Sequence, residues 1–201
     1  MSAICGMADL NFNTFDFELL RAMAKAMTMQ GWDTSLSYIK GGVGLQGDLK
    51  RNENGQKSLF VKSAPSGNLA IIFDGELSNK KELSVGLSLS DNSCSAELAL
   101  SAYATLGVSA LSYLDGEFAF AIYNEQQKEL LLAKDKKGAK PLFYTLQPQA
   151  LIFASEITPL LCALPTSDNP EKSISELPSG CFAVYSPFGL EICLIGEPYH
   201  P

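Results

Sequence analysis

Histidine and cysteine, which serve as metal ligands and nucleophiles, are few in this chain of 201 residues and lie far apart. The single histidine, His200, is one residue from the end, and no cysteine belongs to a CxxC pair. Zinc sites need clustered cysteine and histidine ligands, so we expect no metal and no cofactor. An odd number of scattered cysteines also argues against disulfides. The cysteines are Cys5, Cys94, Cys162, Cys181 and Cys193.

Five short motifs give a more specific signal through their order. They are CG at Cys5, FDGEL from Phe73, LDGEFAFAIY from Leu114, LLLAKDKKGAKPLFY from Leu130 and FASEI from Phe153. This order resembles the class II glutamine amidotransferase domain, most closely the amino-terminal half of glutamine-dependent asparagine synthetases. The resemblance covers nearly the whole chain and implies one domain over residues 1–201. We expect no synthetase half within these residues, since no Gly-rich nucleotide loop follows a strand. Either the domain stands alone, or its partner is another chain or a removed segment.

Cys5 aligns with the nucleophile of the family that the motifs resemble. In that family a cysteine at the mature amino terminus attacks the glutamine amide, and its own α-amino group accepts the thiol proton. Here Met1 to Ile4 precede Cys5, and a peptide nitrogen is not a base. One interpretation is that these four residues are removed, by attack of the Cys5 thiol on the Ile4 carbonyl. The other is a buried cysteine that packs as a small hydrophobic residue.

The family's oxyanion hole is an NGE motif, in which the asparagine side chain and the glycine N–H donate hydrogen bonds. The corresponding residues here are Asp74, Gly75 and Glu76. Loss of an oxyanion donor costs about 2.7–4 kcal/mol of transition-state stabilisation, and an ionised Asp74 would also repel the oxyanion. Only a protonated Asp74 could donate. The structural alternative is a polar turn after a core strand.

The residues that hold the two ends of glutamine in the family also differ here. The resemblance places Asp48 where the family has an arginine for the α-carboxylate, and Ser95 where it has an aspartate for the α-ammonium. Asp91 is a second candidate for the ammonium, and a helix cap is the structural reading of Ser95. Lysines in the segment 134–140 are interpreted as solvated loop charges, without a ligand.

Hydrophobic periodicity predicts the elements that position these residues. A helix capped by Thr14 should bury Phe17, Leu20, Met23, Ala24 and Met27, and a second helix should run from a Ser95 cap to Gly107. Strands are predicted at 4–10, 36–45, 57–63, 69–77, 117–123, 129–135, 141–146, 150–156, 181–186 and 190–195, with a short helix at 156–164.

Several predicted strands are apolar on both faces, which is typical of strands between two layers. We therefore expect an α+β fold: a four-layer αββα sandwich of two antiparallel sheets covered by helices. The family resemblance implies the same architecture, the fold of amino-terminal nucleophile hydrolases.

Composition limits the partners. The chain is 46% hydrophobic and 18% charged, with a formal net charge of −7, so it can bury one core but offers no basic surface for nucleic acid. No apolar stretch is long enough to cross a bilayer, and the amino terminus does not resemble a secretion signal, so we expect a cytoplasmic protein.

Two hypotheses about function follow. In the first, the fold persists while glutamine hydrolysis is weakened or lost, and the domain acts as a binding module for a synthetase-like partner or as a homo-oligomer. In the second, removal of Met1 to Ile4 gives an active glutaminase that supplies ammonia to a synthetase partner, or an amide hydrolase with another small substrate. Four departures favour the first hypothesis: the residues Met1 to Ile4 before Cys5, and the changes at Asp74, Asp48 and Ser95.

Overall fold

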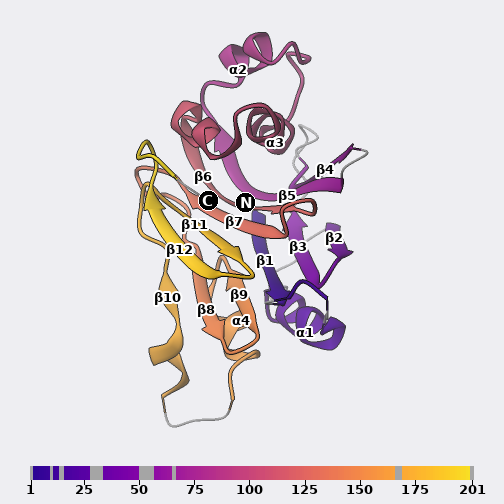
Figure 1. Ribbon diagram of the computed structural model, residues 1–201, viewed down its shortest axis with the longest axis vertical. Helices are drawn as coiled ribbons and strands as arrows, with labels where there is room; N and C mark the ends of the chain where they lie inside the picture. Colours follow the sequence, from indigo (N-terminus) through magenta and orange to yellow (C-terminus); the bar gives the residue numbers. More distant parts are fainter. Residues whose placement is uncertain are drawn as a thin grey trace.

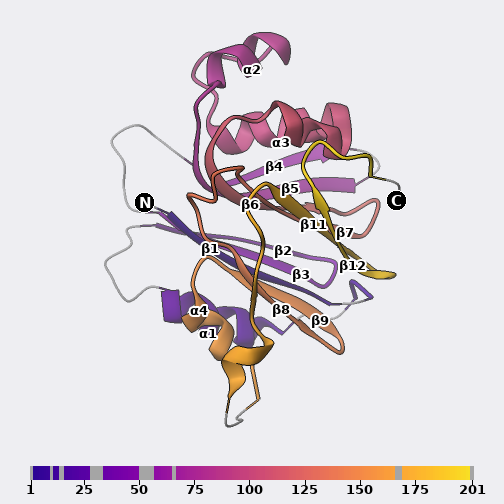
Figure 2. The same ribbon diagram turned by 90° about the vertical axis from the view of Figure 1, so that its left-hand side faces the viewer.

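The computed structural model describes residues 2–9, 11–13, 16–27, 34–49, 57–64, 67–165 and 169–199. Over these ranges the chain forms two stacked antiparallel sheets of six strands each, with helices on both outer faces (Figures 1 and 2). Figure 2 shows the four layers edge-on. The predicted four-layer α+β sandwich is confirmed.

The first sheet contains the amino-terminal strand near its middle. In spatial order its strands are β10 (Ser175–Glu176), β8 (Phe143–Gln147), β9 (Ala150–Ala154), β1 (Ser2–Asp9), β3 (Val43–Leu49) and β2 (Thr34–Lys40). Helices α1 (Phe17–Met27) and α4 (Ile157–Leu161) cover its outer face.

The second sheet contains the FDGEL segment. In spatial order its strands are β12 (Gly189–Leu194), β11 (Cys181–Ser186), β7 (Glu129–Lys134), β6 (Gly116–Asn124), β5 (Gly67–Leu77) and β4 (Leu59–Ala64). Helix α3 (Ser95–Leu106) and the 3₁₀ helix η1 (Gly107–Tyr113) pack on its outer face, and α2 (Lys80–Gly86) projects beyond them (Figure 2). A second 3₁₀ helix, η2, spans Pro170–Ser173.

Strand β6 shows why the sandwich forms. Its alternate residues Ala119, Ala121 and Tyr123 face the other sheet, whereas Phe118 and Phe120 pack against the helical layer. All five side chains are almost fully buried. Successive side chains of a strand point to opposite faces, so an uninterrupted apolar strand is stable only between two layers.

Aromatic side chains close the inter-sheet core at the end of the sandwich away from the FDGEL segment of β5. Phe12 stacks on Tyr123 with ring centroids 5.9 Å apart and contacts Tyr185 at 6.0 Å. Burial raises the pKa of both tyrosines to about 12, so their phenols stay protonated at neutral pH.

Two sequence predictions about the first half of the chain are wrong. The segment 36–45 is not one strand, because Gly41 and Gly42, with φ of +58° and +75°, form a turn between β2 and β3. Phe17 is 54% exposed, since it begins α1 and does not reach the buried face of the helix. The predicted cap Thr14 lies outside the described residues.

None of the helices within the described ranges has the combination of length and apolar character that a bilayer-spanning helix requires.

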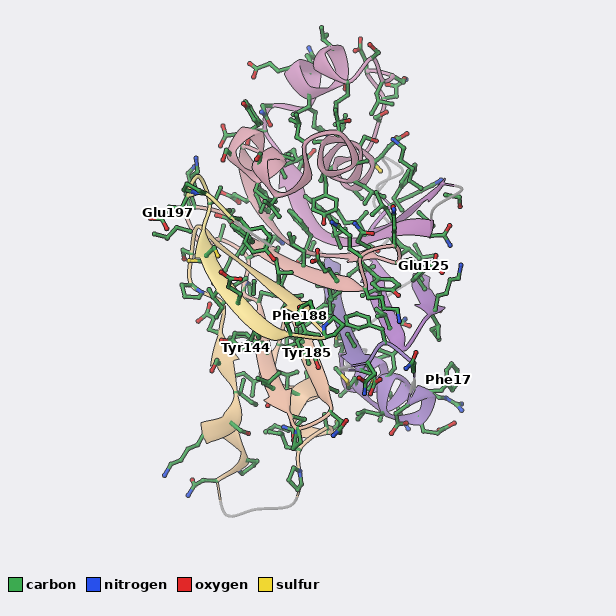
Figure 3. The ribbon with its side chains drawn as sticks, in the orientation of Figure 1. Phe17, Glu125, Tyr144, Tyr185, Phe188 and Glu197 are labelled. Atoms are coloured by element: carbon green, nitrogen blue, oxygen red, sulfur yellow. The ribbon has the colours of Figure 1, made fainter. Side chains whose placement is uncertain are left out.

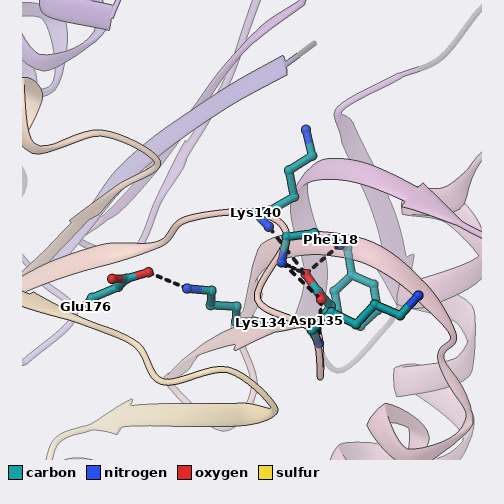
Figure 4. Close-up of polar contacts among 7 residues, drawn as sticks. Phe118, Lys134, Asp135, Lys140 and Glu176 are labelled. Atoms are coloured by element: carbon teal, nitrogen blue, oxygen red, sulfur yellow. Dashed lines mark hydrogen bonds and ion pairs between the residues drawn. The ribbon is translucent and has the colours of Figure 1, made fainter.

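Asp135 organises the loop between β7 and β8, which connects the two sheets. Its buried carboxylate accepts backbone hydrogen bonds from Phe118 at 3.2 Å, Lys137 at 2.9 Å, Ala139 at 3.1 Å and Lys140 at 3.4 Å. One side chain therefore fixes the start of β6 and the path of the loop (Figure 4).

We expect the change Asp135→Ala to lower the free energy of unfolding by at least about 3 kcal/mol, because several buried N–H groups lose a charged acceptor together. Urea denaturation measures this difference. The control Asp91→Ala removes an exposed carboxylate and should change stability by less than about 0.5 kcal/mol. Equal effects of the two changes would contradict this role of Asp135.

Candidate active site

Cys5 lies in the middle of β1, where it pairs with Gln46 of β3 and Ala154 of β9. Its side chain is fully buried in an apolar cluster that includes Met23 of α1 and Leu160 of α4. This cluster lies between the first sheet and its helices. The thiol therefore faces the helical layer and not the space between the two sheets.

The peptide bond that precedes Cys5 is part of the sheet. Ile4 pairs with Gly47, and its side chain is fully buried in the inter-sheet core. The backbone N–H of Ser155 donates to the Ile4 carbonyl at 2.8 Å, and the Ile4 N–H donates to Ser155 Oγ at 3.0 Å. Residues before Cys5 thus extend β1, and the Cys5 nitrogen is an amide within a paired strand.

Asp74 lies near the end of β5 on the face that points to the other sheet. It forms a row with Ala119 of β6 and Lys134 of β7, which are its neighbours in register. Asp74 is 3% exposed, and the ammonium of Lys140 donates to its Oδ1 at 3.1 Å. The Asp74 carboxylate therefore acts as a hydrogen-bond acceptor here, whereas an oxyanion hole needs a donor.

The prediction that the lysines of segment 134–140 are solvated loop charges is wrong for Lys134 and Lys140. The Lys134 side chain is only 4% exposed and forms an ion pair with Glu176 of β10 (Figure 4). The Lys140 ammonium reaches Asp74. Lys134 continues the inward-facing row of Leu130 and Leu132, so the alternation along β7 could have indicated a buried lysine. Sequence reasoning also missed Ser155, whose side chain has no distinguishing motif.

Gly75 and Glu76 follow Asp74 but have different surroundings. Gly75 has φ of +121°, and a Cβ there would lie 2.0 Å from the Glu117 carbonyl oxygen, so only glycine fits. Glu76 is exposed and forms an ion pair with Lys80 at 2.7 Å. Glu76 is thus engaged at the surface, away from Cys5.

Ser95 is the first residue of α3 and is buried. The cap position belongs to Cys94, and Ser95 Oγ instead accepts a hydrogen bond from the Leu77 backbone N–H at 3.1 Å. The predicted cap role of Ser95 is therefore wrong. Its hydroxyl ties the helix to the end of β5, which is a structural contact.

Cys5 and Asp74, the two side chains predicted to be catalytic, lie on opposite sides of the first sheet. Asp48 pairs with Ala3 in the register of β1 and β3, and its side chain lies outside the described residues. Cys5 faces the helices of the first sheet, and Asp74 faces the inter-sheet space from the second sheet. The first sheet thus separates the Cys5 thiol from the Asp74 carboxylate.

Within the described ranges, no group of three or more histidine, cysteine, aspartate or glutamate side chains is arranged to hold a metal ion. His200 lies outside those ranges.

The pairing of Asp74 with Lys140 generates a prediction about stability. We expect Asp74→Asn and Lys140→Met each to destabilise the fold, because each leaves a partly buried charge without this partner. The double variant should lose less than the sum of the two, with a coupling free energy of about 1–3 kcal/mol. Denaturation of the four proteins measures this quantity. Strict additivity would show that the ion pair contributes no net stability.

Comparisons with known proteins agree with this fold and this sequence. Asparagine synthetase [glutamine-hydrolyzing] 2 of Bacillus subtilis is 28% identical over 165 residues, which cover 80% of this chain and 22% of the relative. Amidase chry2 of Gibberella zeae is 33% identical over 115 residues, covering 51% and 17%. The chain thus spans less than a quarter of the length of these curated relatives.

A solved structure gives an independent view of the fold. The structure of glutamine phosphoribosylpyrophosphate amidotransferase from B. subtilis, complexed with ADP and GMP, superposes with a TM-score of 0.73. The match covers 98% of this chain and 50% of that one, at 18% sequence identity. The family model described as a glutamine amidotransferase domain matches residues 1–182. This chain therefore belongs to the glutamine amidotransferase domain family, as a class II domain of the asparagine synthetase type.

Proposed function

We propose that this chain is a single amidotransferase-type domain in which glutamine hydrolysis is weakened or lost, and that it acts as a binding module for a synthetase-like partner. The observation that carries this proposal is the position of the Ile4–Cys5 peptide bond. The Ile4 carbonyl and the Ile4 N–H both form hydrogen bonds with Ser155. The Cys5 thiol is fully buried.

The chemistry of an amino-terminal nucleophile requires a free amine beside the thiol. A free α-amino group has a pKa of about 7.7–8.0, and it can accept a proton near neutral pH. The Cys5 nitrogen is instead an amide whose neighbours are paired with β3 and β9. Without this base, the reaction lacks the amine that would take the thiol proton and later protonate ammonia as it leaves.

The second reason lies at Asp74. An asparagine in its place would donate to the developing oxyanion, whereas the carboxylate accepts a hydrogen bond from Lys140. Asp48 adds a third departure, because a carboxylate at that position would repel the α-carboxylate of glutamine. Three independent changes affect three different requirements of the same reaction.

Relatives support the partner part of the proposal. The matched asparagine synthetase is described as glutamine-hydrolyzing, and this chain corresponds to 22% of its length. The matched residues are a small part of that synthetase, and we propose that a synthetase module is the partner of this chain. A cytoplasmic location, predicted from the sequence, is part of the same proposal.

One observation favours the alternative function, an amide hydrolase that forms after removal of Met1 to Ile4. The Ser155 N–H donates to the carbonyl that the Cys5 thiol would attack. Attack would form a bond between Sγ and the Ile4 carbon, break the bond from that carbon to the Cys5 nitrogen, and move the thiol proton to this nitrogen. Water would then hydrolyse the thioester and leave Cys5 with a free amine.

We expect the wild-type protein and its Cys5→Ala variant to release ammonia from glutamine at the same background rate. A chain shortened to begin at Cys5 should also stay at background, because Asp74 and Asp48 remain. Adding Asp74→Asn and Asp48→Arg to the shortened chain should also leave ammonia release at background, because the first sheet separates the Cys5 thiol from residue 74.

Thermal unfolding serves as the control, since removal of the buried Ile4 side chain lowers stability and all variants must be assayed in the folded state. Ammonia release by wild type that disappears in Cys5→Ala would contradict the proposal. A Cys5-dependent gain in the doubly changed, shortened chain would contradict this separation of the Cys5 thiol from residue 74.

A further inference from the structure

Strand β12 has one unpaired edge. Among the described strands its only hydrogen-bonded neighbour is β11, so the backbone N–H and C=O groups on its other side point outward. Unpaired edges recruit further strands unless lysine, proline or a bulge prevents it. The edge strands β2 and β4 carry Lys40 and Lys62, whereas β12, with the sequence GLEICL, contains neither lysine nor proline.

One face of β12 is entirely apolar. Leu190, Ile192 and Leu194 pair with Tyr185, Ala183 and Cys181 of β11 and share their inter-sheet face. Ile192 is 42% exposed and Leu194 is 50% exposed.

A short edge strand of the first sheet lies on the same side of the molecule as these residues. The edge strand of the first sheet on this side is β10, which has only two residues, and Figures 1 and 2 both show β10 and β12 on the same side of the molecule. Phe188, in the turn before β12, is 100% exposed (Figure 3). The apolar surface of Ile192, Leu194 and Phe188 thus lies next to unpaired backbone groups.

The pattern of β12 is complementary to itself. In an antiparallel pair, residues that face each other lie on the same side of the sheet. A two-fold axis perpendicular to the sheet must therefore pass midway between one residue and the same residue of the other copy. An axis at Ile192 places Ile192 opposite its copy and Leu190 opposite Leu194 of the partner subunit. An axis at Glu191 would place two carboxylates opposite each other, which is unfavourable.

We propose that this chain forms a two-fold symmetric dimer through antiparallel pairing of β12 with β12 of a second copy, centred on Ile192. The pairing gives the outward backbone N–H and C=O groups of β12 hydrogen-bond partners. It extends the sheet across both copies and covers Ile192 and Leu194. The only charge of the strand, Glu191, faces Cys193 of the partner subunit and avoids its own copy. Such strand addition is a common mode of protein association. The dimer does not depend on the proposed function, because Cys5 and Asp74 take no part.

Cysteine cross-linking tests the pairing and its register. In a Cys193→Ser background, Ile192→Cys places two thiols on the axis, at the Cα separation of about 4.5–5.5 Å that facing residues have and disulfides need. Mild oxidation should give a disulfide-linked dimer on a non-reducing gel. The matched control is Val61→Cys, at a residue that is 39% exposed on the edge strand β4. It should run as a monomer on the same non-reducing gel, because Val61 lies outside the proposed interface.

Sedimentation provides a test without new thiols. The wild-type protein should sediment at twice 21.6 kDa at tens of micromolar. Ile192→Lys should weaken the dimer at least about 100-fold, because it places two ammonium groups opposite each other, while Val61→Lys should leave it intact. Circular dichroism confirms that each variant is folded.

A monomeric wild type, a dimer that survives Ile192→Lys, or cross-linking through Val61→Cys would each overturn the proposal. Cross-linking through Ile192→Cys with loss of the dimer in Ile192→Lys supports it.

Discussion

The Ile4–Cys5 peptide bond, held inside a paired strand, is the constraint on which the account of this molecule depends. Class II chemistry needs the cysteine to be a chain terminus, with the thiol and the amine on one residue. Here Ile4 fills part of the inter-sheet core, and Ser155 is bonded to both its N–H and its carbonyl. The residues that would have to leave are therefore part of the fold, and their removal would take a fully buried side chain from the core.

Paired buried charges hold the same end of the sandwich together. Asp74 forms an ion pair with Lys140, and Lys134 forms one with Glu176. The Asp135 carboxylate accepts hydrogen bonds from backbone N–H groups of the loop between β7 and β8. A buried charge is stable only when it is paired or hydrogen-bonded, and these groups satisfy one another. This network connects both sheets and stabilises the fold without glutamine.

Much of this architecture could be predicted from the sequence, because burial dictates the pattern of the central strands. The apolar residues on both faces of β6 required a layer on each side, and the motif order around Cys5 and Asp74 indicated the family. The turn at Gly41 and Gly42 was missed, since apolar residues continue on both sides of it. Helix α2 was missed as well, because it is short and has only one buried residue, Ser84.

The candidate site was harder to predict than the fold. Its outcome depends on which face of a strand each residue occupies and on contacts between distant segments. The pairs Asp74 with Lys140 and Ile4 with Ser155 join residues 66 and 151 positions apart, which no local pattern records. The role of Ser95 was equally hard to predict, because its hydroxyl accepts a hydrogen bond from Leu77 of β5 and does not cap its own helix.

The central claim is that Cys5 stays within the chain, and the intact mass of the purified protein tests it most directly. The account predicts a species that begins at Met1 or Ser2 and persists through prolonged incubation at neutral pH. A species that begins at Cys5, formed by wild type but not by Cys5→Ala, would contradict it.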